Sequence, residues 1–439
     1  MTDTTIKSVF GRRVWDSRGR PTVEVDVRLG CGATGRAIAP AGASMGSGEA
    51  VDLRDGGKAF GGLDVRRAVA AVNEEISACL IGLDADHQEE VDGAMVRLDG
   101  TPDRARLGGN AIVATSMAVL QARAAAEKLP LWLYLSGGRD IRMPLPEIQI
   151  FGGGAHAARR VDIQDFMIMC PGATSFSEAL DWTAEVYLAA GALMKERGSL
   201  QGVADEGGYW PAFGSNEEIL DTLVLAIERA GFKPGEDVAI SLDVAASEFG
   251  RNGLYTLALG GKKYETDEWI SILGGWLETY PILSIEDPLS EDDPKGFQTF
   301  TRLYGATCQI IGDDYLVTNA ARVTRAAADK ALTAVLIKPN QAGTITETRK
   351  ALEAAKAAGL GTIVSARSGE TEDVIISHLS TGWDAGQFKV GSFARSERMA
   401  KWNECLRIEE ALGSRARFAG REGLVFASAI PERARGERR

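Results

Sequence analysis

Hydrophobic and polar residues alternate strictly between residues 20 and 30, with valine and leucine on one face and threonine or charged residues on the other. A period of two predicts a half-buried β-strand. A glycine-rich turn then leads into a second apolar run at residues 37–39, so we expect the two strands to form a meander. Further on, helical spacing over residues 65–76 and an alanine-rich stretch over residues 110–128 predict helices.

The pattern changes near residue 143, where prolines cluster around a glycine pair. Such a cluster marks a boundary, and we predict two domains, residues 1–142 and 143–439. In the second domain, short apolar runs alternate with helical segments, which is typical of a parallel barrel or a doubly wound sheet. The predicted strands are Val238–Leu242, Ile282–Ile285, Cys308–Ile311, Thr333–Ile337 and Thr362–Val364.

The sequence indicates where several helices of the second domain begin. Two of them open with capping sequences, at Ser175-x-x-Glu178 and Ser215-x-x-Glu218. A last strong helix is predicted near residues 395–412, with one apolar face. The arginine-rich tail from Pro431 is expected to be a solvated end and not a binding arm.

The chain of 439 residues carries 49 basic and 61 acidic residues, a formal net charge of −12. An acidic balance argues against a broad face for nucleic acid or an anionic membrane, although a few basic side chains in a cleft could still bind a small anion. No apolar run is long enough to span a membrane, and the first residues lack the pattern of a secretory signal. The five cysteines form no CxxC pair, which favours a reducing compartment. We therefore expect a cytoplasmic protein with neither nucleic acid nor membrane as a partner.

A charged residue stands at or just after the end of each predicted barrel strand. These residues are Asp243, Glu286, Asp313, Lys338 and Arg367. The carboxyl ends of the strands share one face of a (β/α) barrel and carry its active site, so we expect these side chains to converge. A single acidic strand end would more simply be a helix cap or a surface charge, but five in phase favour a site. Carboxylates without histidine or cysteine suit a hard cation, Mg²⁺ before Zn²⁺.

Lys338 has two interpretations in such a site. It could be a counter-ion of the carboxylates, or it could act as a general base, because a nearby Mg²⁺ lowers the pKa of an ammonium group. In the second case the expected substrate is a carboxylic acid with an acidic α-hydrogen. The spacing of the residues leaves both interpretations open.

The chain resembles the enolase family over nearly its whole length. The matching motifs are Asp16-Ser17-Arg18-Gly19, Gly42-Ala43-Ser44, Gly153-Gly154 before His156, Asp205-Glu206-Gly207-Gly208, Ser241-Leu242-Asp243, Glu286-Asp287-Pro288, Gly312-Asp313-Asp314, Lys338 with Asn340-Gln341, Arg367-Ser368-Gly369-Glu370-Thr371, and Ala394-Arg395-Ser396-Glu397-Arg398 with Lys401. This many matches in one order are highly specific. The resemblance implies an α/β fold in which an N-terminal α+β capping domain precedes a modified (β/α)₈ barrel of the TIM type.

The resemblance also implies catalytic and metal-binding roles. Lys338 would remove the α-proton, and Glu206 would protonate the leaving hydroxyl group. A lysine base beside Mg²⁺ is a known arrangement of enolase-superfamily sites, so this role comes with the family. Two Mg²⁺ ions are expected in each active site. The residues implied to bind them are Asp243, Glu286 and Asp313 for the first ion and the loop of Ser44 for the second.

Further residues are implied to surround a small phosphorylated or phosphonylated carboxylic acid. They are His156, Gln164, Asp165, Ala366, Arg367, Ser368 and Lys401. Arg367 and Ser368 would hold the phosphate, a role suited to the planar guanidinium group, and Lys401 would hold the carboxylate. Family members are usually dimers or larger, so we expect a homodimer or a larger homo-oligomer.

Several positions near the substrate depart from the family pattern. Ala366 stands where enolases have histidine, and Asp165 stands where they have glutamate. The other departures are Ala41 and Met45 in the closing loop, Gln149 and Gly152 before His156, and Tyr209-Trp210 after Glu206. Loss of one polar partner at a reacting group typically costs about 2–4 kcal/mol of transition-state stabilisation. An enzyme with these changes should therefore be slow on ordinary 2-phosphoglycerate.

This pattern favours a retained dehydration acting on a changed substrate. A 2-phosphoglycerate analogue enlarged at phosphorus, such as 2-phosphonoformylglycerate, would fit the direction of the changes and would give carboxyphosphonoenolpyruvate. Carboxyphosphonoenolpyruvate synthase of phosphonate antibiotic pathways is one enolase-like family with such a role. Two alternatives remain open, namely an ordinary glycolytic enolase and a non-catalytic scaffold that binds metal or a surface.

Overall fold

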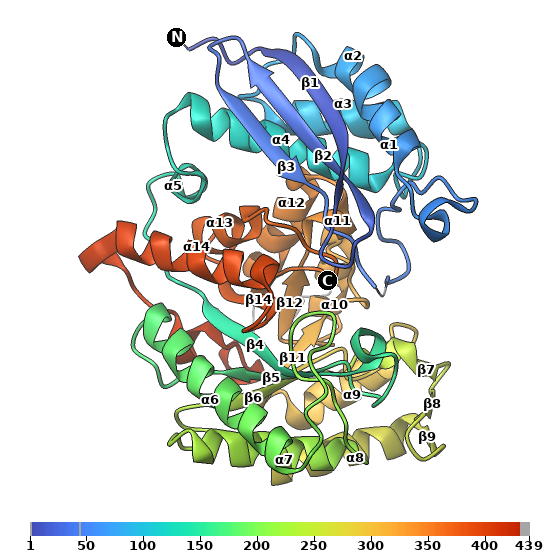
Figure 1. The fold of residues 1–439 in the computed structure, drawn as a ribbon, viewed down its shortest axis with the longest axis vertical. Coiled ribbons are helices and arrows are strands. Elements are labelled where there is room, and N and C mark those ends of the chain that lie inside the picture. The colour runs from blue at the N-terminus through green and yellow to red at the C-terminus, as the bar shows by residue number, and fades with distance from the viewer. Residues whose placement is uncertain (1, 44, 431–439) are drawn as a thin grey trace, which may run out of the picture.

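The N-terminal part of the chain forms an antiparallel sheet packed on helices. We describe the protein from a computed structural model, which covers residues 2–43 and 45–430 (Figure 1). The sheet has the order β1-β2-β3, with β1 at Ile6–Trp15, β2 at Pro21–Leu29 and β3 at Thr34–Ile38. The predicted strand and meander are confirmed. The first five residues of β2 are buried on both faces, and its acidic side is covered by arginines such as Arg12, which pairs with Glu24.

Five helices accompany this sheet. They are α1 (Arg66–Ala71), α2 (Ser77–Leu80), α3 (Gln88–Asp99), α4 (Gly109–Ala126) and α5 (Leu131–Ser136). The alanine-rich α4 is the predicted long helix, and it lies against β2 and β3. At Gly35 of β3 an added Cβ atom would lie only 2.1 Å from the carbonyl oxygen of Ala118, so the close approach of strand and helix requires glycine here.

Eight of the other described strands close into a barrel with the order β10-β11-β12-β13-β14-β4-β5-β6. Their bounds are β4 (Leu145–Gly152), β5 (Asp165–Met169), β6 (Ala239–Asp243), β10 (Ile282–Glu286), β11 (Gln309–Gly312), β12 (Ala334–Ile337), β13 (Gly361–Ser365) and β14 (Gly386–Ser392). Only β5 runs antiparallel to its two neighbours. The predicted modified (β/α)₈ barrel is therefore confirmed, and the doubly wound sheet is wrong because the strands close on themselves.

All five predicted barrel strands are present, but β4, β5 and β14 were not predicted. β4 and β14 hold buried polar residues among apolar ones, Glu147 and Gln149 in β4 and Gln387 and Lys389 in β14. Such strands show neither a clean alternation nor an unbroken apolar run, so their hydrophobic pattern does not predict them.

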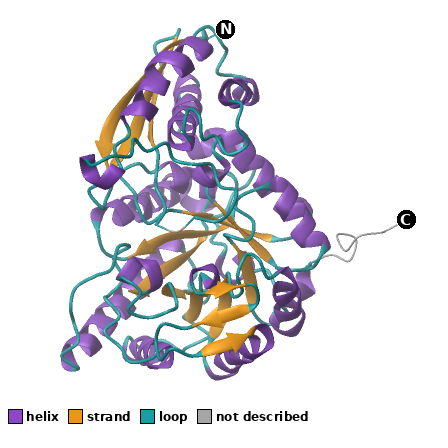
Figure 2. Ribbon diagram, turned by 90° about the vertical axis from the view of Figure 1, so that its right-hand side faces the viewer, coloured by secondary structure: helices purple, strands orange, loops and turns teal. Residues whose placement is uncertain are grey.

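Helices surround the barrel on its outside (Figure 2). They are α6 (Phe176–Glu196), α7 (Asn216–Arg229), α8 (Thr266–Thr279), α9 (Pro294–Tyr304), α10 (Ala320–Ala328), α11 (Pro339–Ala342), α12 (Ile345–Ala357), α13 (Ile375–Gly382) and α14 (Ser396–Leu412). A small sheet adds β7 (Gly250–Arg251), β8 (Leu254–Thr256) and β9 (Lys263–Glu265). Among the described residues, no helix combines the length and apolarity needed to cross a bilayer.

The two predicted capping sequences act as helix caps. The hydroxyls of Ser175 and Ser215 accept hydrogen bonds from the backbone N–H groups of Glu178 and Glu218, respectively. Each glutamate carboxylate reaches back one residue further than a capping box requires, because Glu178 accepts from the N–H of Thr174 and Glu218 from that of Gly214.

The N-terminal unit lies over the carboxyl ends of the barrel strands (Figure 1). Ala41, in the loop after β3, forms a backbone bridge with Gly369 in the loop after β13. Asp92 of α3 joins the unit to α12, since its carboxylate accepts hydrogen bonds from Ser116 and from the N–H of Thr346. The predicted loop residue Ser44 and the tail from Pro431 lie outside the described residues.

Candidate active site

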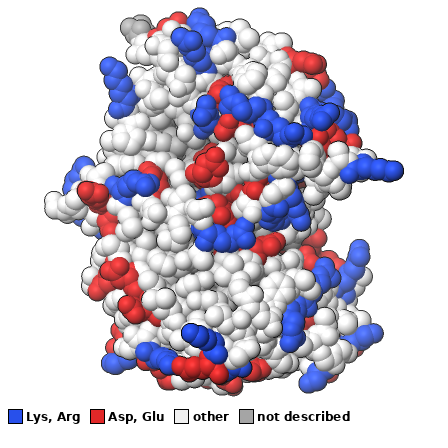
Figure 3. Space-filling view, in the orientation of Figure 1, with Lys and Arg blue, Asp and Glu red and all other residues white. Residues whose placement is uncertain are grey.

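The charged strand ends converge as predicted. Asp243 and Glu286 are the last residues of β6 and β10, and Asp313, Lys338 and Arg367 follow β11, β12 and β13 closely. A pocket opens above them beneath the loop after β3. Its lining residues are Ala43, His156, Gln164, Asp165, Glu206, Asp243, Lys338, Ser365, Ala366, Arg367, Ser368, Lys389 and Val390. Figure 3 shows acidic and basic side chains intermixed on one face of the molecule, so this face carries no broad patch of a single sign.

Two lysines stand among the three carboxylates at the floor of this pocket. The Nζ atom of Lys338 lies 2.5 Å from Oδ2 of Asp313. The Nζ atom of Lys389 lies 2.7 Å from both Oδ2 of Asp243 and Oε2 of Glu286. All five side chains are buried. Each carboxylate therefore has a cationic partner, which offsets the repulsion that three converging acids would otherwise have.

The pKa shifts in this cluster follow from burial and from these ion pairs. Burial and the neighbouring Asp243 hold the pKa of Glu286 well above its usual range. Burial also acts to raise the pKa of Asp313, but Lys338 outweighs it and lowers that pKa. Conversely, burial acts to lower the pKa of Lys338, and Asp313 outweighs it and raises that pKa. As long as Asp313 is its partner, Lys338 is thus held in the charged form.

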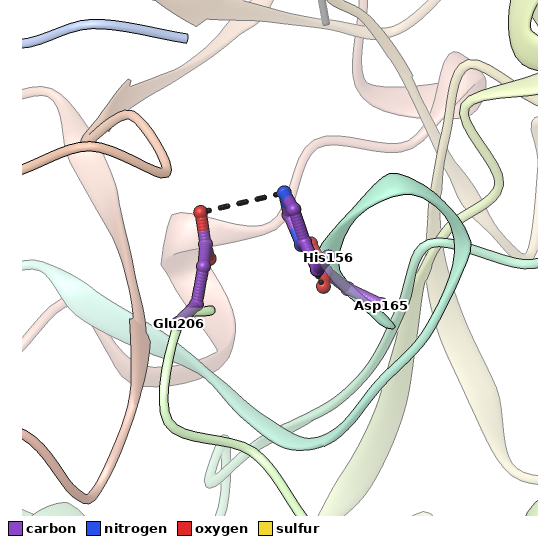
Figure 4. A group of neighbouring side chains, drawn as sticks. All are labelled: His156, Asp165 and Glu206. Atoms are coloured by element: carbon purple, nitrogen blue, oxygen red, sulfur yellow. Dashed lines mark hydrogen bonds and ion pairs between the residues drawn. The ribbon is translucent and has the colours of Figure 1, made fainter. Parts of the chain in front are cut away.

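A second cluster, Asp165–His156–Glu206, lies at another wall of the pocket (Figure 4). The Nδ1 atom of His156 is 3.0 Å from Oδ1 of Asp165, and its Nε2 atom is 3.7 Å from Oε1 of Glu206. Burial acts against the charged imidazole, but the two carboxylates outweigh it and raise the pKa of His156 to about 9. His156 is therefore protonated at neutral pH and presents an N–H group to Glu206.

Gln149 supports this cluster from below. Its amide group donates to Asp165, and its carbonyl oxygen accepts the N–H of Gly208 at 2.8 Å. The departure at position 149 thus connects the other departure, Asp165, to the loop that carries Glu206. Tyr209 of the same loop does not line the pocket; its ring stacks on Tyr187 with centroids 4.4 Å apart.

Arginines dominate the side of the pocket beneath the loop after β3. Arg367 donates to Glu49 at 2.9 Å and to Asn340 at 3.1 Å. Arg18 donates to the carbonyl oxygen of Ala41 at 2.9 Å and lies 3.4 Å from the hydroxyl oxygen of Ser368. This side can therefore bind an anion. Arg367 is connected directly to the loop after β3 through Glu49.

The structure does not place Lys401 in the pocket. This lysine lies on α14, is fully buried, and its ammonium group contacts Glu370 at 3.0 Å and the carbonyl oxygen of Thr371 at 2.6 Å. Its predicted role in binding the substrate carboxylate is wrong, because α14 lies outside the barrel. Lys389 is the lysine that lines the pocket. The sequence signal for Lys389 is its position in β14 between the apolar residues Phe388 and Val390.

Most of the other predicted site residues lie together. His156, Gln164, Asp165, Glu206, Asp243, Lys338, Ala366, Arg367 and Ser368 line the pocket. Glu286 and Asp313 lie beside the lysines at its floor. Ser44 is outside the described residues. Glu49 and Gln341 were not predicted, and they connect the loop to the floor, since the amide of Gln341 donates to both Asp313 and Glu49.

The donor set of the floor fits a hard divalent cation. Buried oxygens without a hydrogen-bond partner occur on Gln164, Asp165 and Glu286, all of them neutral or anionic oxygen donors. Within the described part of the chain, the compact groups of potential ligand atoms are His156–Asp165–Glu206 and Asp287–Asp313–Asp314. In the latter, Asp287 accepts the backbone N–H groups of Asp313 and Asp314, a structural role. The predicted triad is less compact, because the lysines lie between its carboxylates.

Together, the barrel and its pocket define an enzyme with an acid–base site for a small anion. Comparison with known proteins identifies the family. The enolase N-terminal domain matches residues 6–135, and the enolase C-terminal TIM barrel domain matches residues 140–426. The chain belongs to the enolase family, and it is a lyase of the enolase type, a dehydratase.

Relatives named enolase match nearly the entire chain. "Enolase 1" of Desulfitobacterium hafniense (strain Y51) is 48% identical over 427 residues, 97% of this chain and 97% of the relative. "Enolase 2" of Pseudomonas syringae pv. syringae (strain B728a) is 47% identical over 424 residues, 96% of this chain and 99% of the relative. "Enolase 2" of Pseudomonas syringae pv. tomato (strain ATCC BAA-871 / DC3000) is 46% identical with the same coverage.

Proposed function

We propose that the protein removes water from a 2-phosphoglycerate-type acid that carries an additional group on phosphorus. The phosphonoformyl analogue, which would give carboxyphosphonoenolpyruvate, is the candidate substrate. The observation that carries this proposal is the side chain at position 366. Ala366 lines the pocket directly before Arg367 and Ser368, at a position where the resemblance predicts an imidazole. The smaller side chain leaves room beside the residues proposed to bind phosphorus.

The floor of the pocket would supply the base and the metal ligands. Asp243, Glu286 and Asp313 would hold a Mg²⁺ ion, and the loop that carries Ser44 would contribute to a second. When bound, Mg²⁺ would neutralise the charge that develops on the substrate carboxylate. Lys338 is the proposed base, and it must first give up the pairing with Asp313 that holds it protonated.

The dehydration itself would use two residues of this chain. Lys338 takes the α-proton, the electron pair of the broken C–H bond forms the double bond, and the C–O bond to the leaving hydroxyl group breaks. Glu206 gives that hydroxyl group a proton, so that water leaves. His156 carries a proton at neutral pH, 3.7 Å from Glu206, and is suited to support this step.

The remaining pocket residues would bind the substrate. Arg367 and Ser368 are proposed for the phosphorus group, and Gln164 for the polar groups of the acid. Lys389 replaces Lys401 as the residue proposed for the substrate carboxylate. We also propose, from the family resemblance, that the protein is a homodimer or a larger homo-oligomer and acts in the cytoplasm.

The test is a mass-spectrometric assay of water loss from 2-phosphoglycerate and from its phosphonoformyl analogue, each with Mg²⁺. We expect kcat/KM to favour the analogue, and the variant Ala366→His to shift the ratio toward 2-phosphoglycerate by about tenfold or more. The outcome against the proposal is rapid turnover of 2-phosphoglycerate with none of the analogue, which would make the protein an ordinary enolase. That alternative is favoured by the names of the relatives.

A further inference from the structure

Glu147 is a buried carboxylate inside the barrel to which the proposed reaction gives no role. It lies in the middle of β4 with 0% exposure. Its Oε2 atom accepts a hydrogen bond from the hydroxyl of Ser241 at 3.3 Å, and its Oε1 atom has no hydrogen-bond partner. A buried carboxylate with so few partners is costly, so its presence inside the barrel needs a reason.

Lys389 is the cation whose charge acts on Glu147. β14 and β4 pair in parallel, and Lys389 is the register partner of Glu147. Both side chains are buried within the barrel, and Lys389 is 6% exposed. Burial raises the pKa of Glu147 to about 7, with Lys389 opposing this shift, so the carboxylate is ionised in mildly alkaline solution. The two residues thus form a cross-strand pair of opposite charge.

The present partners of Lys389 are the residues that the proposed function assigns to Mg²⁺. Its Nζ atom is 2.7 Å from oxygens of both Asp243 and Glu286. A divalent cation on these oxygens would compete with the ammonium group and repel it. Until the substrate carboxylate binds, Lys389 would then need another acceptor, or it would remain a buried, unpaired charge.

Two other carboxylates could accept the ammonium group of Lys389 without displacing the bound divalent cation. Oδ2 of Asp165 is 3.9 Å from Nζ of Lys389 and has no hydrogen bond, but Oδ1 of Asp165 is already hydrogen-bonded to His156. The Oε1 atom of Glu147 has no hydrogen-bond partner, and Lys389 is the one cation whose charge lowers the pKa of Glu147. Glu147 is therefore the carboxylate that can pair with the ammonium group of Lys389 without disturbing the Asp165–His156–Glu206 cluster.

We propose that Glu147 is a positioning residue that receives Lys389 when a divalent cation occupies Asp243 and Glu286. It keeps the ammonium group charged at the pocket floor while the two carboxylates are released to the cation. This inference rests on the proposed metal-binding role of Asp243 and Glu286. It predicts that Glu147 assists Mg²⁺ binding by acting on Lys389.

The first experiment compares Mg²⁺ binding to the full chain by titration calorimetry in mildly alkaline buffer. Glu147→Gln keeps the shape of the side chain and removes its charge. We expect it to weaken Mg²⁺ binding by about tenfold, the size of one close charge pair. The matched control is Asp92→Asn, which removes a buried charge at the junction of α3 and α12, and it should leave the affinity unchanged. Thermal unfolding verifies that both variants are folded.

The second experiment separates an effect through Lys389 from a general effect of charge. In the background Lys389→Met, Mg²⁺ should bind more tightly than in the wild type, and adding Glu147→Gln should change the affinity no further. The same tenfold loss in both backgrounds would overturn the inference and leave the proposed function intact. A wild-type protein that binds no Mg²⁺ would overturn the proposed metal site, and the inference with it.

Discussion

The two ends of the pocket differ in how far they keep the family pattern. The floor consists of three carboxylates, each of which forms an ion pair with one of two lysines. These residues are Asp243, Glu286, Asp313, Lys338 and Lys389. The walls carry departures at Asp165 and Ala366, and Gln149, which supports Asp165, is a further departure. Residues that would handle the α-proton and the metal are thus present, whereas those around the leaving group and the phosphorus group are altered. Under the proposed function, chemistry and substrate choice would be controlled by separate parts of the pocket.

The largest expected effect concerns Glu206, the proposed acid at the altered end. In Glu206→Gln we expect dehydration to slow by about 10³-fold, because the leaving hydroxyl group loses its proton donor. Exchange of the α-proton with solvent should continue, since Lys338 is untouched. The measurement is product formation by mass spectrometry beside α-exchange by NMR. If exchange is lost together with dehydration, the two ends do not act separately.

The next effect is on stability and concerns His156. The folded protein retains the proton up to about pH 9, whereas the unfolded chain releases it near 6.5, so the stabilisation is present below 6.5 and is lost as the pH rises to 9. In metal-free protein, this should lower the free energy of unfolding by about 3 kcal/mol over that range.

Denaturant unfolding of wild type and His156→Gln isolates this contribution. The difference in unfolding free energy between the two should shrink as the pH rises through the window from 6.5 to 9. A difference that stays constant would mean that Asp165 and Glu206 do not hold the imidazole charged.

The third effect distinguishes two lysines that the sequence alone confuses. Lys389→Ala should raise KM by about 10²-fold through loss of a charged hydrogen bond to the substrate carboxylate. Lys401→Ala should change KM little and instead lower the free energy of unfolding by about 3 kcal/mol, because Glu370 is left buried without its cation. The measurements are KM from steady-state kinetics and the free energy of unfolding from denaturant titration, for both variants. A raised KM in Lys401→Ala and an unchanged KM in Lys389→Ala would place Lys401 in the site.

The same pair of lysines shows how far the sequence determines the site. Asp243, Glu286 and Lys338 were predictable because each ends or follows an apolar run, and parallel strands bring their carboxyl ends together. Lys389 was not, because it lies within a strand whose glutamine and lysine conceal the apolar pattern. Lys401 matched a family motif, but only the packing of α14 shows that it faces Glu370 and not the pocket.

Supporting residues were the least predictable part of the site. Glu49 and Arg367 are far apart in the chain, and nothing local indicates that they form an ion pair at 2.9 Å. The same holds for Gln149, whose two hydrogen bonds join β4 to β5 and to the loop of Glu206. Such contacts depend on how complete strands and loops are placed, which local periodicity does not report.

The central proposal is that Lys338 removes the α-proton of the proposed substrate. The most direct measurement is NMR of solvent deuterium entering the α-carbon of 2-phosphoglycerate and of its phosphonoformyl analogue, with Mg²⁺, in wild type and Lys338→Ala. We predict exchange in the wild type and a loss of about 10⁴-fold in the variant, with Mg²⁺ still bound. Equal exchange in both proteins would contradict the claim.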